Sequence, residues 1–416
     1  KIRSADTGDN LFLCSIVALD AVTGKYKWHY QINPGETWDY NAAMDMHLAD
    51  LTIDGKPRKV LMQAPKNGFT YVIDRISGKL ISAEKIAKVT WASHIDLTTG
   101  RPVETPGARF PDGQPFEMWP GVLGAHGWLP SSFSPRTGLM YIPVMERGML
   151  FSDKGITPGG WRRTPGKAYD FALNLDFNVT DPLNETSWLK AYDPVARRIV
   201  WSVKTPGLMS GGTMATAGAL VFQGDVDSNF NAYAADTGRK LWTFRTQAPT
   251  FSAPISYAAD GVQYVTVVTG VGTTAGHATA QLPDPPDYRG QHRRVLTFRI
   301  GGKAALPART DMPQPFPADA SFRPDAGLAQ RGAILFGTHC AVCHGTGAIS
   351  GGGAPDLRRS PVSYNAELFT AIVHGGGLVS NGMPRFGEIK EEDLRAMQHY
   401  LREEGRVARE GRRAAP

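Results

Sequence analysis

The feature that most limits the fold of this chain is a loose repeat that recurs over its first 300 residues. Three clear copies run from Ala18 to Trp28, from Ala191 to Trp201 and from Ala232 to Trp242. Two weaker copies span Tyr71–Leu80 and Phe133–Tyr141. Each copy has the pattern of a strand, a tight turn with Asp or Gly, and a second strand, and the clear copies end in Trp.

A hairpin of this kind cannot bury its own apolar face, so several copies must pack against one another. The distance along the chain from Trp201 to Trp242 falls within the period of a four-stranded propeller blade. The 46 Gly and 30 Pro residues also favour many turns and short strands. The sequence therefore predicts a mainly β fold over residues 1–300, as a β-propeller or part of one.

The composition changes after residue 300. Residues 301–324 are rich in Ala, Pro, Arg and Asp, which predicts an extended linker, and residues 325–416 follow as a separate small domain. We expect a helix over residues 325–336 that carries Leu328 and Ile334. A second helix is expected over residues 391–404, because apolar residues recur there at helical spacing. Those residues are Leu394, Met397, Tyr400 and Leu401.

The motif Cys340-Ala-Val-Cys343-His344 lies directly after the first expected helix. This spacing attaches a c-type haem: the two thiols bind the porphyrin and His344 becomes an axial ligand of the iron. The alternatives are half of a zinc site or a redox-active Cys pair. Zinc would require further ligands at matching spacing, and the third cysteine, Cys14, lies in an apolar run typical of a buried strand. The domain is therefore predicted to be a small all-α cytochrome c.

The second axial ligand of the haem iron is expected from the loop between the two helices. Met383 stands beside a Pro in a Gly-containing loop, and a thioether ligand there would raise the haem potential. Met397 is a rival that is better explained by packing on its helix. His374 is a further alternative.

The overall composition limits the compartment and the partners. The net charge of +6 lies partly in the Arg-rich end, Arg402–Arg413, which reads as a solvated tail and not as a nucleic-acid surface. No run of about 20 apolar residues exists to span a membrane. Haem is attached to cysteines outside the cytoplasm, so we expect a periplasmic protein. The chain opens at Lys1, so any signal peptide is expected to have been removed or to lie outside this sequence.

A second candidate site lies in the β part. The stretch Pro34–Asn41 places aromatic residues around carboxylates, and Asp39 stands at its centre. Lys66 follows in a Pro-Lys-Asn-Gly turn. Taken alone, an Asp in such a loop is more often a turn residue and such a Lys more often a surface residue, so the residue types do not by themselves predict catalysis.

The order of these features resembles the quinohaemoprotein alcohol dehydrogenases, which use pyrroloquinoline quinone (PQQ). Members of that family have an eight-bladed propeller followed by a cytochrome c domain. The resemblance covers nearly the whole chain, and its motifs come in an unusual order. The matching segments are 15–20, 38–40, 64–68, 124–126, 211–213, 222–225 and the haem domain.

The resemblance implies roles for single residues. It makes Asp39 the catalytic base beside a calcium ion, and Lys66 the cation that bonds a quinone oxygen of PQQ. Asn41 stands where lanthanide-dependent relatives carry a second Asp, so the match favours calcium. Trp38 would line the cofactor site or be one more packing Trp.

The chain also departs from the family pattern. The vicinal cysteine pair, the Trp beneath the cofactor ring, and the Glu and Asn calcium ligands cannot be placed, so we expect the chain to begin partway round the propeller. Gly127 stands where relatives usually carry an Asn that contacts the cofactor, and Val271 where they usually carry Trp.

The expected function is oxidation of a small alcohol by PQQ and calcium. Electrons would pass through haem c to an external acceptor, which could be a cytochrome, a copper protein or a multihaem subunit. Contact with a membrane is expected only through a partner subunit, and no nucleic acid is expected as a partner. The alternatives are a non-catalytic propeller scaffold with an appended cytochrome, and a sugar or polyol dehydrogenase with the same cofactor.

Overall fold

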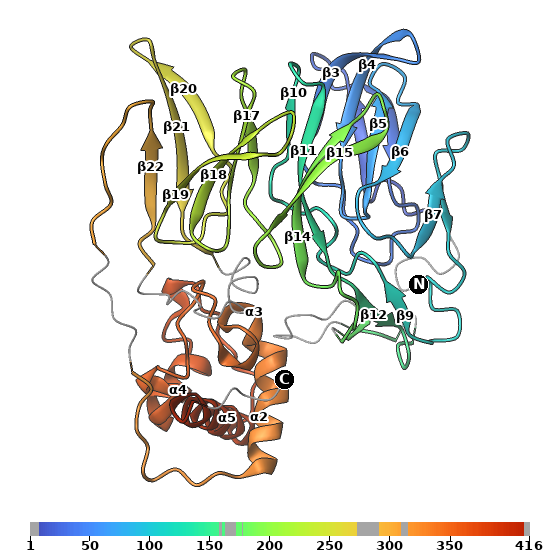
Figure 1. Ribbon diagram of the computed structural model, residues 1–416. Helices are drawn as coiled ribbons and strands as arrows, with labels where there is room; N and C mark the ends of the chain where they lie inside the picture. Colours follow the sequence, from blue (N-terminus) through green and yellow to red (C-terminus); the bar gives the residue numbers. More distant parts are fainter. Residues whose placement is uncertain are drawn as a thin grey trace.

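The computed structural model describes residues 8–157, 160–162, 172–176, 178–272, 291–308 and 315–411. Strands occupy the chain from Ser15 to Phe298, and helices follow from Ala326 to Arg409 (Figure 1). The predicted fold, a mainly β part followed by a small helical part, is confirmed. Residues 309–314 of the predicted linker and the end of the basic tail lie outside the described residues.

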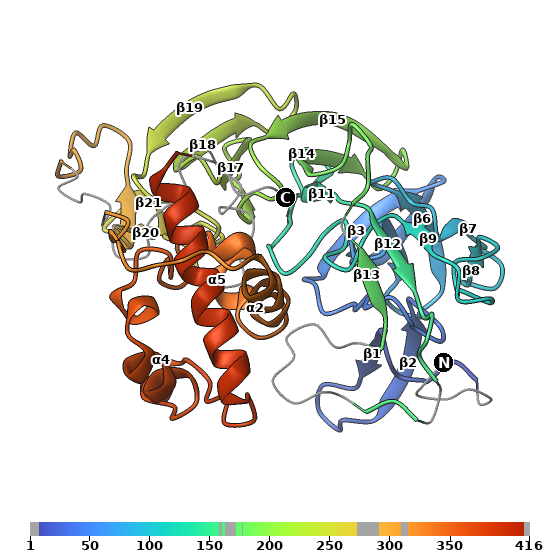
Figure 2. The same cartoon turned by 90° about the horizontal axis from the view of Figure 1, so that it is seen from below.

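Short antiparallel sheets build the β part. Three have four strands each: β3 (His47–Ile53), β4 (Lys56–Gln63), β5 (Phe69–Asp74) and β6 (Leu80–Lys85); β10 (Ser132–Ser134), β11 (Leu139–Glu146), β14 (Thr186–Asp193) and β15 (Arg198–Thr205); β16 (Thr213–Ala215), β17 (Leu220–Gly224), β18 (Asn229–Ala234) and β19 (Lys240–Arg245). Shorter sheets are β1 (Ser15–Leu19) with β2 (Tyr26–Gln31); β7 (Ala92–Ile95) with β8 (Pro102–Glu104); β9 (Phe116–Met118), β12 (Met149–Ser152) and β13 (Asn174–Asp176); and β20 (Ile255–Ala259), β21 (Val262–Thr269) and β22 (Arg294–Phe298). Figure 2 shows the sheets following one another around an arc, as propeller blades do.

The turns inside the blades explain the repeated Asp and Gly of the sequence. Between β5 and β6, Asp74 Oδ1 accepts the backbone N–H groups of Ile76 and Ser77. Gly78 closes the turn by donating its N–H to Asp74 O, with φ at 74°. The Asp74 carboxylate accepts the backbone N–H groups of turn residues that have no partner on a neighbouring strand. Gly78 adopts the left-handed backbone without strain.

The repeated Trp residues join one blade to the next. The Trp28 indole donates to Arg75 O (3.1 Å), and a Cβ on Gly78 would lie 2.7 Å from the Trp28 ring. Trp201 makes the same contact between two later blades: it donates to Ala235 O (3.1 Å), and a Cβ on Gly238 would lie 2.6 Å from its ring. The Gly of each turn is therefore also the surface on which a Trp of the preceding blade packs.

The helical part contains α2 (Ala326–His339), α3 (Ala341–His344), α4 (Ala366–Val373) and α5 (Glu391–Arg409), with 3₁₀ turns η1 (Thr346–Ala348), η2 (Pro361–Tyr364) and η3 (Val379–Asn381). Both predicted helices are confirmed. Asp325 caps α2 by accepting the N–H of Leu328 (2.9 Å). The sequence did not predict α4.

Helices α2 and α5 cross at Gly332, where a Cβ would lie 2.1 Å from Ala396 O. This crossing turns Leu328 and Ile334 away from the core, so the two apolar residues noted on this predicted helix do not pack in it: Leu328 is 40% and Ile334 66% exposed. The predicted face of α5 is correct, because its four apolar residues are all buried. They are Leu394, Met397, Tyr400 and Leu401.

Cys14 does not lie in the core. It is half-buried in the turn before β1, with φ at 49°, so the prediction of a buried strand residue is wrong. The apolar run around Cys14 suggested a buried strand, but its residues Leu11, Phe12 and Leu13 are exposed.

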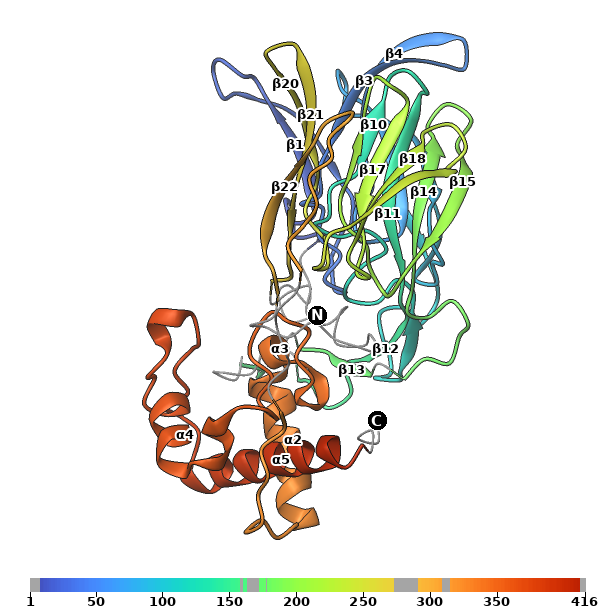
Figure 3. The ribbon, with the colours of Figure 1, turned by 60° about the vertical axis from the view of Figure 1, so that its left-hand side comes forward.

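The helical part lies against one end of the strands, with α3 nearest to them (Figures 1 and 3). Gln291 bridges the two parts. Its Oε1 accepts the N–H of Val271 in the β part (2.6 Å), and its Nε2 donates to Gly352 O in the loop after α3. Across the residues that the structure describes, every helix is too short or too polar to cross a membrane.

Candidate functional site

Asp39 lies in the loop between β2 and β3. Its φ of 64° places it in the left-handed region, which a non-Gly residue adopts at a cost of about 1–2 kcal/mol. Its side chain is 45% exposed, whereas Trp38 and Tyr40 on either side are completely buried. The strained residue Asp39 thus exposes its carboxylate at the surface, while its neighbours Trp38 and Tyr40 are fixed in the core.

Lys66 reaches Asp39 from the loop between β4 and β5. Its Nζ donates to Asp39 Oδ2 (2.9 Å) and to Asp39 O (3.1 Å). The Lys66 side chain is only 14% exposed, so the pair is shielded on the lysine side and open on the carboxylate side. The structure therefore brings together the two residues of the predicted propeller site.

The segment Gly124–His126 packs against Lys66. A Cβ on Gly124 would lie 2.4 Å from Lys66 Cγ, so only glycine leaves room for the lysine stem. Ala125 donates its N–H to Lys66 O (2.9 Å), and the buried His126 ring faces Ala64 O and Leu129 O. These contacts connect the Lys66 loop to the segment 124–126.

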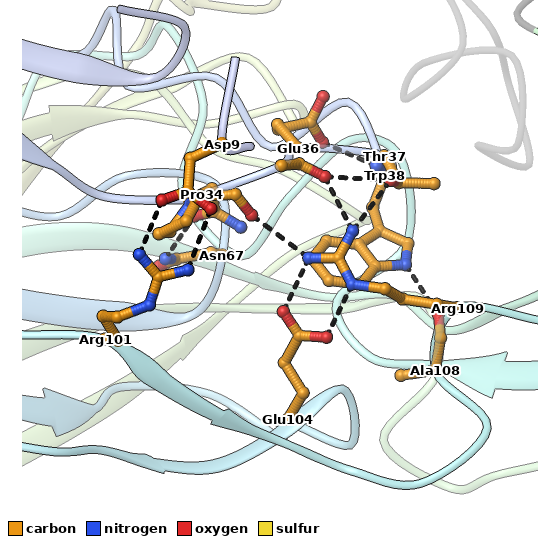
Figure 4. A network of polar contacts seen from close by, with 12 residues as sticks. Asp9, Pro34, Glu36, Thr37, Trp38, Asn67, Arg101, Glu104, Ala108 and Arg109 are labelled. Carbon is orange, nitrogen blue, oxygen red and sulfur yellow. Dashed lines mark hydrogen bonds and ion pairs between the residues drawn. The ribbon is translucent and has the colours of Figure 1, made fainter. Parts of the chain in front are cut away.

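Trp38 is held inside the fold. Its indole N–H donates to Ala108 O (2.8 Å), and its ring centroid lies 5.1 Å from that of Trp91. The guanidinium of Arg109 covers the ring at 4.6 Å (Figure 4). Trp38 has no exposed surface and supports the Asp39 loop from inside the fold. Its role therefore differs from that of Trp28, which packs on a turn glycine.

Arg109 is a residue of this site that the sequence did not indicate. It forms a bidentate ion pair with Glu104, with both N···O distances at 2.6 Å. It also donates to Pro34 O (3.1 Å) and Gly35 O (2.7 Å), at the start of the Asp39 loop (Figure 4). No sequence signal connects Arg109 to this loop, because its partners are backbone carbonyls more than 70 residues away.

Asp39 can supply one oxygen ligand to a calcium ion. Within the described ranges, no three His, Cys, Asp or Glu side chains are grouped so as to hold a metal. The described residues therefore fit only part of the predicted calcium site.

The haem motif lies on a short helix. Cys340 ends α2 and begins α3, and Cys340 O accepts the N–H groups of Cys343 (3.1 Å) and His344 (3.0 Å). The His344 Nδ1 faces Pro355 O (2.9 Å), so this nitrogen is committed to the backbone and Nε2 is left for iron. The ring is 8% exposed, and burial lowers the pKa of His344. A neutral imidazole with a fixed orientation fits an axial haem ligand.

Both thiols are at least partly removed from solvent. Burial, together with the nearby Cys343, raises the pKa of Cys340 to about 12, and burial raises the pKa of Cys343. Cys340 packs against a core to which α2 contributes Phe336, α4 contributes Phe369 and the loop after η3 contributes Phe386. An apolar core beside Cys340 fits the attachment of a porphyrin.

The three candidates for the second axial ligand differ in their surroundings. Met383 is half-buried in the loop after η3 and packs against the same core as Cys340. Met397 is completely buried on α5 within that core, and the His374 ring faces Ile389 O (3.2 Å). These surroundings favour Met383, which stays a prediction.

The two positions that depart from the family pattern are both buried. A Cβ on Gly127 would meet no atom closer than 3.6 Å, so the backbone there has room for a small side chain. Val271 is 2% exposed and takes part in the Gln291 bridge to the helical part. Val271 thus contributes to domain contact through its backbone.

Comparisons with known proteins support the arrangement of both parts. Residues 3–90 and 86–265 match the family described as glucose/ethanol/alcohol dehydrogenase, beta-propeller domain. Residues 327–401 match the family described as cytochrome C oxidase, cbb3-type, subunit III.

Among the similar curated proteins are two quinohemoprotein alcohol dehydrogenases. ADH IIB of Pseudomonas putida is 44% identical over 96% of this chain and 57% of its own length. The enzyme of Comamonas testosteroni is 40% identical over 96% of this chain and 56% of its own length. The chain spans little more than half the length of these relatives.

A solved structure of ADH-IIG from Pseudomonas putida superposes on this fold with a TM-score of 0.82 at 39% identity, covering 97% of this chain and 60% of that one. The propeller match alone covers more than half of the chain, and the cytochrome match follows it along the sequence. The chain belongs to the PQQ-type alcohol dehydrogenase propeller family, in its quinohaemoprotein branch with a C-terminal cytochrome c domain.

Proposed function

We propose that the whole protein oxidises a small alcohol to an aldehyde and passes the electrons through its own haem. The observation that carries this proposal is the Lys66–Asp39 ion pair, 2.9 Å long, on a PQQ-type propeller joined to a Cys-x-x-Cys-His domain. A scaffold would not require a shielded lysine beside a strained, surface-presented aspartate.

Asp39 is proposed as the base that accepts the hydroxyl proton of the alcohol. Its carboxylate is 45% exposed, enough to meet a small molecule, and the Lys66 ammonium lies 2.9 Å from it. Lys66 is proposed to bind a quinone oxygen of PQQ, and Asp39 to be one of several calcium ligands. When bound, PQQ supplies the two-electron oxidant and calcium polarises it as a Lewis acid. Trp38 was expected to line the cofactor site or to be a packing Trp; because it is completely buried, it is proposed here as a packing residue that supports the Asp39 loop.

The helical part is proposed to hold haem c. Cys340 and Cys343 would form the thioether bonds, and His344 and Met383 would be the axial ligands. The haem supplies a one-electron carrier. The Gln291 bridge holds the loop after α3 against the β part and so keeps the two sites in one fixed arrangement.

The remaining features of the proposal follow from the chemistry. Covalent haem attachment favours the periplasm, and reduced haem needs an external acceptor such as a cytochrome, a copper protein or a multihaem subunit.

The domain limits proposed are 1–300 for the propeller portion, 301–324 for the linker and 325–416 for the cytochrome domain. One relative, from Gluconobacter oxydans, is named as a dehydrogenase subunit, which favours a partner subunit as acceptor.

Dye reduction by the full-length protein, loaded with PQQ and Ca²⁺, tests the proposal. We expect reduction to depend on a primary alcohol and Asp39→Asn to lower kcat by about 10²–10⁴-fold, the range for loss of a general base. A panel of polyols and sugars separates the sugar-dehydrogenase alternative. No reduction with any alcohol, polyol or sugar would leave the scaffold interpretation.

A further inference from the structure

The carboxylate of Glu36 lies beneath the turn of chain that presents Asp39. Glu36 is 8% exposed. Its Oε1 accepts the backbone N–H of Trp38 (2.5 Å) and the backbone N–H of Tyr40 (2.9 Å). These two amides flank Asp39 in the sequence, so one oxygen atom holds the chain on both sides of the proposed base.

This contact explains how Asp39 keeps its left-handed backbone. A left-handed residue among right-handed or extended ones turns nearby N–H groups into one concavity that binds an anion. Here the anion is the side chain of Glu36, three residues before Asp39. Without it, the N–H groups of Trp38 and Tyr40 would be buried and unsatisfied, which is unfavourable. The loop would then gain by returning Asp39 to an ordinary backbone conformation.

The rest of the loop is anchored independently of Glu36. Arg109 holds its first residues through Pro34 O and Gly35 O (Figure 4). The Tyr40 hydroxyl donates to Pro120 O directly after Asp39. Loss of the Glu36 contact should therefore change the conformation at Asp39 while the anchored residues on either side of it stay in place.

We propose that Glu36 is a positioning residue that sets the direction of the Asp39 carboxylate and its contact with Lys66. The inference rests on the proposed role of Asp39 as proton acceptor. Proton transfer requires the base within about 2.6–3.2 Å of the hydroxyl, so a small displacement of Asp39 lowers the rate of the chemical step more than the affinity for the alcohol.

Three substitutions in the full-length protein separate the acceptor atom from the charge. Glu36→Gln keeps an oxygen in place without the charge, Glu36→Asp keeps the charge but withdraws it by one methylene, and Glu36→Ala removes both. We expect kcat to fall about 10–100-fold in Glu36→Ala, less in Glu36→Asp and least in Glu36→Gln, with KM changed less than about twofold. If the Ala variant does not fold, the order of the Gln and Asp variants still decides.

Asp193→Ala is the matched control. Asp193 Oδ1 also accepts two backbone N–H groups, those of Val195 and Ala196, but in a turn between β14 and β15. This variant should lose stability and keep kcat. Equal kcat in all three Glu36 variants, or a loss in Glu36→Gln as large as in Glu36→Ala, would overturn the proposal.

A crystal structure of the Glu36→Ala or Glu36→Asp protein gives a readout that needs no activity. We expect the 2.9 Å contact between Lys66 Nζ and Asp39 Oδ2 to be lost and Asp39 to leave the left-handed region. An unchanged Asp39 loop would disprove the role of Glu36. An unsubstituted protein that oxidises no alcohol would instead disprove the proposed function, and the crystal structure would still decide the role of Glu36.

Discussion

Single glycines determine how one blade contacts the next. Gly78 and Gly24 occupy equivalent turns with φ of 74° and 68°, but only Gly78 lies against a Trp ring. Gly24→Ala should cost about 1–2 kcal/mol, because Ala is strained in the left-handed region. Gly78→Ala adds overlap with Trp28 and should cost about 1–3 kcal/mol more. Urea unfolding followed by Trp fluorescence measures both, and equal losses would contradict the blade-docking role of Gly78.

Asp45 gives the β part a dependence on acid. Burial opposes its ionisation, but hydrogen bonds from His47 and Ser131, with the nearby His126, lower the pKa of Asp45 to about 2. A lowered folded-state pKa stabilises the fold above the unfolded-state value near 4, and this is lost as pH falls toward 2.

Asp45→Asn should therefore cost about 2 kcal/mol at pH 6 and almost nothing at pH 2. Urea midpoints of both proteins between pH 2 and pH 6 test this. A constant difference across that range would show that Asp45 makes no pH-dependent contribution.

Sequence and resemblance together indicated Asp39 and Lys66, and the structure places them in contact. Glu36 and Arg109 were missed although Glu36 lies within the same aromatic stretch. Both act largely on backbone groups, and a backbone N–H or carbonyl has no identity in a sequence. Such contacts become visible only when the path of the chain is known.

At the scale of elements, the crossing of α2 and α5 depends on Gly332. A Cβ there would lie 2.1 Å from Ala396 O and 2.6 Å from Tyr400 Cβ, whereas a Cβ on Gly337 in the same helix would meet nothing within 4 Å. Gly337→Ala should stabilise the helical part by about 0.5–1 kcal/mol through helix propensity. Gly332→Ala should destabilise it by about 1–3 kcal/mol or more, because the helices must separate.

Unfolding of the helical part followed by haem absorbance measures both changes. Stabilisation by Gly332→Ala would contradict the close crossing.

The same crossing explains where reading the elements from sequence succeeded and failed. The face of α5 was predicted because four apolar residues recur at helical spacing over a long segment. The packed face of α2 was not indicated by the sequence, because the contact is made by Gly332 and Phe336 and a glycine carries no apolar signal. Helix α4 has only eight residues, too few for a clear period.

At the scale of the whole molecule, the order of a bladed part and a haem part was readable from sequence, since each has its own local motif. The contact between them was not, because Gln291 and Gly352 are distant in sequence and one partner is a backbone carbonyl. This contact lies in the loop that leads from His344 to Pro355, the residue whose carbonyl faces the His344 ring.

The Gln291 bridge should affect communication between the two sites. Gln291→Ala removes the acceptor for Val271 N–H and the donor to Gly352 O. We expect slower reduction of the haem by alcohol, with dye reduction at the propeller unchanged, because the distance between the sites is no longer fixed. Stopped-flow absorbance of the haem measures this, and an unchanged rate would show that the bridge does not limit electron transfer.

Electrons taken from an alcohol in the propeller are proposed to leave through the haem of the same chain. Anaerobic haem spectra of the full-length protein with PQQ and Ca²⁺, recorded after alcohol is added without any external acceptor, test this proposal. We predict a reduced haem in the unsubstituted protein and an oxidised haem in Asp39→Asn, with dithionite reducing both. A haem that dithionite reduces but no alcohol reduces would contradict it.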